Sequence, residues 1–160
     1  MCDAIKGQTA YPLLTAESPA VIAHLNMLQG IITRLAGNSA QCKTWCITLV
    51  TALIAFAGAT HTTGPIVFAI VPVGMLLILD VTYLAQERAY RDLFNDMVVR
   101  VRARSYDENA LFAAGAAFTW HNWFGALQSW SVTPFYASLV VGYVVVMLSG
   151  PLAASLVSVK

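Results

Sequence analysis

Asp80 is an acidic residue set inside an apolar run, with isoleucine and leucine before it and valine after it. A carboxylate at membrane depth is costly to bury, so such a residue is a candidate for a gate or a pore. Asp80 also lies near the end of its run, where snorkelling to water or pairing with Arg88 would be sufficient. This second, structural explanation is the simpler one. We keep it and the gate or pore as alternatives for Asp80.

Charged residues follow in the stretch 87–92, which includes Glu87 and Arg88. Its arginines could bind an anionic ligand through paired hydrogen bonds. A solvated helix face explains the same pattern, because Glu87–Arg91 and Asp96–Arg100 have the i,i+4 spacing of helical ion pairs. Three further arginines are expected to hold anionic lipid headgroups, as basic residues outside a membrane span do: Arg100, Arg102 and Arg104.

Histidine and cysteine do not form a metal site in the sequence. Cys42 and Cys46 would share a helical face, but a metal ion needs further ligands nearby. We interpret them as small apolar groups, and the isolated His24 as a packing or capping residue. The sequence contains no nucleophile elbow, phosphate loop, dinucleotide fingerprint or calcium loop. We therefore expect no enzyme, no metal and no cofactor.

Composition places these residues in a membrane protein. Of the 160 residues, 58% are hydrophobic and 11% are charged, and the mean hydropathy is +0.68. Soluble domains carry about a quarter charged residues and less than half apolar residues. A net charge of +1 provides no basic field, so no direct nucleic-acid binding is expected. The pattern predicts an all-α integral membrane protein with a single domain, 1–160.

The first predicted element is an amphipathic helix over 19–36. Ser18 and Pro19 are typical of a helix start, and Gly37-Asn38-Ser39 is typical of a helix end. Apolar residues recur at helical spacing and form one stripe: Val21, Leu25, Leu28, Ile32 and Leu35. This helix could lie on the membrane surface or pack against a partner helix.

Two spans, 42–60 and 66–84, are predicted to form a tight hairpin. A snorkelling Lys43 extends the first to bilayer length, and the second is expected to kink at Pro72. The second helix should continue beyond the membrane as a cytoplasmic stalk over 85–104, because no glycine or proline interrupts it. Apolar stalk residues are predicted to form an assembly seam with the helix at 19–36 or with a second copy: Tyr83, Tyr90, Phe94, Met97 and Val101.

The C-terminal part is predicted to hold an interfacial segment over 110–131 and a third span over 134–157. Tryptophan favours the membrane interface, and three of the four tryptophans lie in the first of these segments. Basic residues flank the hairpin and are absent from its turn, so the positive-inside rule places the N-terminus and the stalk in the cytoplasm. A third span would leave the C-terminus outside, whereas a segment that dips in and returns would bring it back.

Two stretches, residues 24–56 and 77–97, carry a resemblance to a known group. They read HLNMLQGIITRLAGNSAQCKTWCITLVTALIAF and LILDVTYLAQERAYRDLFNDM. An amphipathic helix, a tight two-span hairpin and an aspartate-tyrosine stretch that runs into a glutamate-arginine stalk resemble small bacterial two-span membrane proteins, including the SLATT-like group of antiphage defence. The resemblance covers roughly residues 19–104. It implies an inner-membrane effector that oligomerises and permeabilises the membrane when a partner senses infection. The chain departs from this group in its third apolar segment and in having no appended sensor domain, so a separate sensor protein is expected.

Three functions follow as hypotheses. The first is an oligomeric effector or ion channel of the bacterial inner membrane, with the lipid bilayer and other copies of the chain as its partners. The second is a non-catalytic anchor or accessory subunit that docks a larger partner through its stalk. The third is a small transporter, for which the spans offer few polar groups beyond Thr48, Thr51 and Tyr143. We favour the first.

Overall fold

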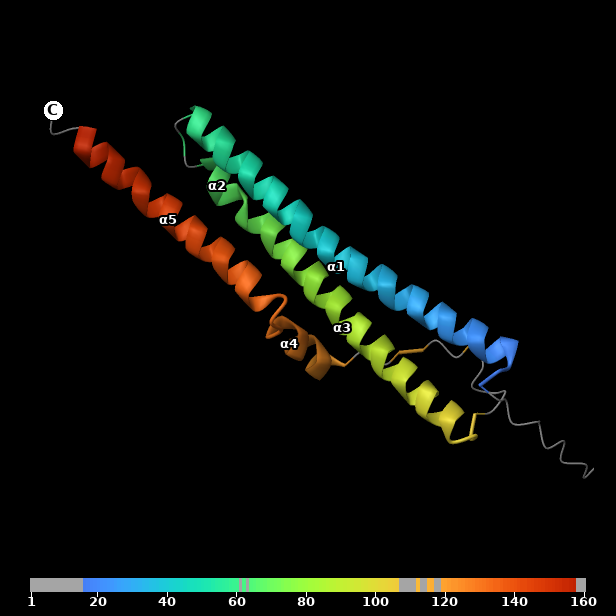
Figure 1. Ribbon diagram of the computed structural model, residues 1–160. Coiled ribbons are helices and arrows are strands. Elements are labelled where there is room, and N and C mark those ends of the chain that lie inside the picture. Colours follow the sequence, from blue (N-terminus) through green and yellow to red (C-terminus); the bar gives the residue numbers. More distant parts are fainter. Residues whose placement is uncertain are drawn as a thin grey trace, which may run out of the picture.

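Long antiparallel helices dominate the structure (Figure 1). The computed structural model describes residues 16–60, 62, 64–106, 112, 115–116 and 119–157. Within these ranges every regular element is an α-helix: α1 (Pro19–Thr60), α2 (Gly64–Phe68), α3 (Ile70–Arg102), α4 (Trp120–Leu127) and α5 (Thr133–Val157). The predicted all-helical class is confirmed for this part of the chain, and so are two helices long and apolar enough to cross a membrane.

α1 runs without interruption from Pro19 to Thr60, so the predicted helix end at Gly37-Asn38-Ser39 is wrong. Glycine inside a helix costs about 1 kcal/mol relative to alanine, and the packing of one continuous face offsets that cost. The buried positions keep helical spacing on both sides of the glycine: Val21, His24, Leu28, Leu35, Ser39, Cys42 and Cys46. The predicted amphipathic helix 19–36 and the predicted span 42–60 are therefore two parts of one helix.

The second long helix is divided near its start by Pro72. Proline has no amide hydrogen, and its ring crowds the carbonyl four residues earlier, which belongs to Phe68. α2 ends at Phe68, and a tighter turn follows in which the Ala69 amide donates to the Ile66 carbonyl at 3.1 Å. The predicted kink thus takes the form of a break at Ala69. From there α3 joins the predicted second span to the predicted stalk in one helix.

The polar ends of α1 and α3 pack together around a buried cluster, here called the stalk core. Its buried members are Val21, Leu28, Met97, Val101 and Tyr106, with Leu25, Tyr90, Leu93 and Phe94 packed around them. Four of the five predicted seam residues are in this cluster, and Tyr83 is partly buried outside it. Of the two pairings predicted for the seam, the structure shows the one within the chain.

α4 lies against α3, and α5 runs beside the hairpin toward the end that carries the hairpin turn (Figure 1). The Thr119 hydroxyl caps α4 by accepting a hydrogen bond from the Asn122 amide at 3.3 Å. The Trp123 indole donates to the Thr82 hydroxyl at 3.2 Å. α5 is a single helix without a return, so the dip-and-return alternative is not what the structure shows. Parts of the predicted interfacial segment lie outside the described residues, namely 110–111, 113–114 and 117–118.

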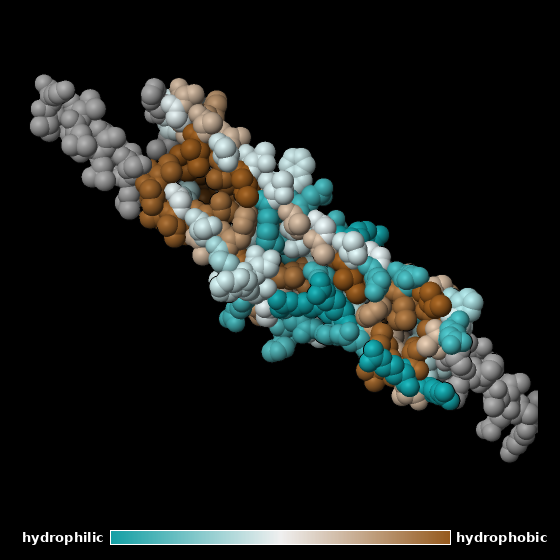
Figure 2. Space-filling view, viewed as in Figure 1, coloured by the Kyte–Doolittle hydropathy of each residue, from teal (hydrophilic) through white to brown (hydrophobic). Residues whose placement is uncertain are grey.

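One half of the molecule exposes large apolar side chains on each of its long helices. Trp45 of α1 is 63% exposed, Met75 of α3 is 62% exposed and Val141 of α5 is 62% exposed. Figure 2 shows hydrophobic residues gathered around this half and hydrophilic residues over the middle of the molecule. We call this half, formed by residues 44–79 together with α5, the apolar end.

Candidate functional site: a buried ion pair between the long helices

Ser39 and Lys43 lie one turn apart on α1, and both contact Asp80 of α3. The Lys43 Nζ is 2.7 Å from Asp80 Oδ2 and donates a hydrogen bond to Oδ1 at 2.8 Å. The Ser39 hydroxyl donates to the same Oδ1 and accepts a hydrogen bond from Lys43 at 3.2 Å. Three side chains from two helices thus form one closed polar group, here called the ion-pair cluster.

The anion of this cluster is completely buried, and its cation is not. Asp80 has no exposed surface, whereas the Lys43 side chain is 18% exposed. A buried carboxylate is tolerated only when a counter-charge and hydrogen-bond donors replace its water. Lysine suits the edge of such a site because its long stem lies along apolar surface while its ammonium reaches toward water. The arrangement fits a boundary between an apolar and an aqueous region.

Apolar side chains close the ion-pair cluster from the side of α4 and α5. The buried group beside it consists of Cys46, Val81, Ala85, Ala126, Val132 and Tyr136. The Tyr136 hydroxyl of α5 is buried in this group and has no hydrogen-bond partner among the described residues. The ion-pair cluster is therefore the point at which α1, α3 and α5 meet.

Arg88 is not the partner of Asp80, and that prediction is wrong. Its guanidinium group donates to the Gly125 carbonyl at 3.1 Å and to the Ser129 hydroxyl at 2.7 Å. Arg88 lies about 12 Å beyond Asp80 along α3, whereas Lys43 of the neighbouring helix lies level with it. The arginine holds the last turn of α4 instead, where the helix dipole favours a cation.

The other charged candidates lie along the stalk. Glu87 is buried and pairs with Arg91 at 2.5 Å, and Asp96 pairs with Arg100 at 2.7 Å, so both predicted i,i+4 pairs are present. The exposed arginines at the end of the stalk are Arg100, Arg102 and Arg104. The three candidates for a polar or gating role, Asp80, Glu87 and Arg88, each have a different partner in the structure.

Sequence reasoning missed Ser39 and assigned Lys43 only a snorkelling role. The available signal was their spacing, because residues four apart on a helix share a face and that face continues the buried stripe of α1. The missing information was the register of α1 against α3. Without it, an acid on one helix cannot be matched to a particular base on the other.

His24 is buried in the stalk core with a specific partner. Its Nδ1 lies 2.6 Å from the Tyr106 hydroxyl, and the Phe112 ring packs at a centroid distance of 5.8 Å. Tyr106 reaches this position after the chain turns at Arg104, which has a positive φ of 51°. Burial raises the pKa of Tyr106. His24 is thus a packing residue, and Tyr106 was not predicted as its partner.

The ion-pair cluster can act as a cation site and as a link between helices. Its carboxylate holds a cation, the Lys43 ammonium, and separation of the pair would present a charge to the apolar end. Cys42 and Cys46 beside it are buried and free, and the described residues contain no group of three side chains suited to a metal ion. Comparisons with protein-family models, curated proteins and solved structures find no match to this chain.

Proposed function

We propose that the chain is an integral membrane protein whose apolar end lies in the bilayer. The exposure of large apolar side chains carries this proposal, because soluble proteins rarely expose apolar patches above a few hundred Å². Trp45, Met75 and Val141 belong to three helices, and a partner bound to one face would leave others in water. Lipid hydrocarbon covers all of them together.

In this proposal the ion-pair cluster marks the depth of insertion. Between Lys43 and Thr60, α1 rises by about 26 Å, which approaches the hydrocarbon thickness of about 30 Å. The partly exposed Lys43 then reaches one interface, and the hairpin turn at Thr62 emerges at the other. Within the described ranges, every lysine and arginine lies on the Lys43 side, which the positive-inside rule assigns to the cytoplasm. The stalk and the N-terminal half of α1 form a cytoplasmic two-helix arm.

Within this membrane the proposed role is that of an oligomeric, non-enzymatic effector that permeabilises the bacterial inner membrane. The supporting feature is a buried charged pair where three helices meet, because membrane proteins use such residues in ion paths. The resemblance to the SLATT-like group supports the same class of function, with a separate sensor protein as the trigger. Since the stalk core occupies the seam within the chain, we assign assembly to the apolar end.

Membrane potential tests this role. Strong induction in bacteria, followed with a potential-sensitive dye, should depolarise cells that express the natural sequence. Asp80→Asn removes the buried charge while it keeps the side-chain shape, and it should abolish the effect. Asp92→Asn removes an exposed charge of the stalk and is the matched control. An undisturbed potential with the natural sequence, or equal depolarisation by both variants, would count against the effector.

A membrane anchor that docks a larger protein is the second candidate, favoured by a groove on the arm. The groove has a volume of about 410 Å³ and is lined by Gln29, Ile32, Thr33, Arg91, Phe94 and Asn95. Thr33→Trp and Asn95→Trp would fill it, and Asp92→Trp is the control outside it. Co-purification of one dominant protein, lost only with the groove variants, would support the anchor. A homo-oligomer without such a partner would contradict it.

The three arginines at the tip of the arm are not assigned to lipid headgroups in this proposal. Arg100 lies about 30 Å beyond Asp80 along α3. If Asp80 marks the membrane boundary and the arm continues along the membrane normal, that distance places the arginines in water. Their exposed positions fit a solvated helix end.

A further inference from the structure

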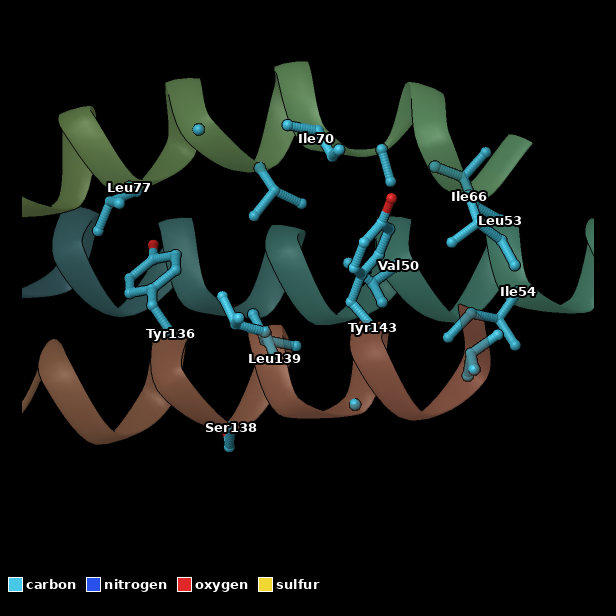
Figure 3. Close-up of a pocket in the computed structure, with 16 residues that line it drawn as sticks. Val50, Leu53, Ile54, Ile66, Ile70, Leu77, Tyr136, Ser138, Leu139 and Tyr143 are labelled. Carbon is cyan, nitrogen blue, oxygen red and sulfur yellow. The ribbon is translucent and has the colours of Figure 1, made fainter. Parts of the chain in front are cut away.

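An elongated apolar cavity separates α5 from the hairpin (Figures 2 and 3). Its volume is about 560 Å³, and its walls come from α1, α2, α3 and α5. Ile54 and Ile66 lie at the end near the hairpin turn, and Leu77 and Tyr136 lie at the opposite end (Figure 3). Tyr143 reaches from α5 across the space between them, while Ser138 points away from it.

Two glycines line this cavity from opposite walls, Gly74 on α3 and Gly142 on α5. Glycine in membrane helices usually permits two backbones to approach closely. A Cβ added at either position would meet nothing within 4 Å, so no neighbouring helix uses the space that these glycines provide. The space is open on one side and nearly all of its lining is apolar, so an apolar occupant would cover these walls in place of a neighbouring helix.

We propose that the cavity binds one acyl chain of a membrane lipid. From Tyr136 to Val146 the lining of α5 extends about 15 Å, about the length that one acyl chain spans in half of a hydrocarbon core of about 30 Å. The cavity starts beside Ile66, close to the turn, and the Tyr136 ring closes it before the ion-pair cluster. This inference rests on the proposed insertion of the apolar end into the bilayer.

The apolar lining fits an acyl chain. A helix of a second copy is the competing occupant, and if it were seated there the chain would retain no lipid and the protein mass would double. An acyl chain is thinner and apolar along its length, as is nearly all of the lining. The open side of the cavity, visible in Figure 2, gives it a lateral entrance from the lipid.

Native mass spectrometry tests the proposal by counting retained lipids. The full chain is reconstituted in vesicles of phosphatidylethanolamine and phosphatidylglycerol, extracted in mild detergent and weighed. The natural sequence should retain one phospholipid per chain. Gly74→Leu and Gly142→Leu should each reduce that retention at least tenfold, because the new side chains occupy the cavity. Both should fold, since leucine favours helix over glycine. Val145→Leu on the exposed face of α5 is the matched control and should keep the lipid.

Equal retention by all variants, or none by the natural sequence, would overturn the proposal. Rapid disulfide formation between Gly74→Cys and Gly142→Cys in one chain would also overturn it, because α5 would then close onto α3 and eliminate the cavity. Failure of the membrane proposal itself has a different signature, since alkaline carbonate would then release the chain from membranes. A chain that stays in the membrane but retains no lipid contradicts the acyl-chain site alone.

Discussion

Lys43 and Asp80 join the two long helices through an ion pair with an Nζ–Oδ2 distance of 2.7 Å. The pair lies at the junction between the apolar end and the stalk, and Ser39 completes it from the same face of α1. Because the carboxylate has no exposed surface, a shifted register of α1 against α3 would leave it buried without its cation, so the contact favours the observed register.

Removal of one partner should therefore destabilise the hairpin more than removal of both. Lys43→Met leaves the Asp80 carboxylate without its cation and should cost about 3–5 kcal/mol in the free energy of unfolding. The double variant Lys43→Met with Asp80→Leu should recover most of that loss. Denaturant titration in mixed micelles, followed by circular dichroism, measures the free energy of unfolding of Lys43→Met, Asp80→Leu and the double variant. If the losses of the two single variants add up to the loss of the double variant, the pair is not coupled.

Gly37→Ala should stabilise the chain by about 1 kcal/mol, because Gly37 lies inside the uninterrupted α1. An added Cβ there would meet nothing within 4 Å. If a helix ended before Gly37 in the left-handed conformation, the same change would destabilise the chain. Gly30→Ala is the matched control, since it lies inside a helix under either description. Thermal unfolding followed by circular dichroism gives the sign of both changes.

The same glycine shows where local sequence signals fail. Gly37-Asn38-Ser39 has the composition of a helix end, but α1 continues because its buried face extends past the glycine and brings Ser39 to Asp80. That contact joins residues 41 apart in sequence, so no local pattern reveals it. Periodicity and the absence of breakers did predict the long helix from the second span through the stalk. The register between helices, which selects Lys43 over Arg88, is a tertiary property.

The cavity beside α5 was also beyond sequence analysis. An apolar run predicts a helix, and its length predicts a span. Gly74 and Gly142 are equally compatible with close helix packing and with open space. Only the position of α5 relative to the hairpin decides between them.

Leu28→Ala should cost about 2–5 kcal/mol, because Leu28 is fully buried in the stalk core. Val99→Ala, at a position that is 62% exposed on α3, should change stability by less than about 0.5 kcal/mol. The stalk core forms within one chain, so Leu28→Ala should lower the unfolding midpoint by the same amount at every protein concentration. A loss that grows on dilution would indicate that the stalk pairs between copies.

Tyr106→Phe should destabilise the arm by about 1–3 kcal/mol at neutral pH, because the His24 Nδ1 loses its partner. Burial raises the pKa of Tyr106 in the folded chain, while the unfolded chain ionises near pH 10. Stability from this group is therefore complete below about pH 10 and is lost as the pH rises further. The free energy of unfolding, measured below and above that pH, should fall less steeply with rising pH for Tyr106→Phe than for the natural sequence. Parallel profiles would contradict the buried position of the hydroxyl.

Cysteine accessibility tests the membrane-spanning hairpin most directly. With Cys2, Cys42 and Cys46 replaced by alanine, Thr62→Cys probes the hairpin turn and Asn95→Cys probes the exposed face of the stalk. A membrane-impermeant maleimide is applied from the periplasmic side, after permeabilisation of the outer membrane, and again after disruption of the inner membrane. The account predicts that Thr62→Cys reacts with the inner membrane intact and that Asn95→Cys reacts only after its disruption. Reaction of both positions from the same side would contradict it.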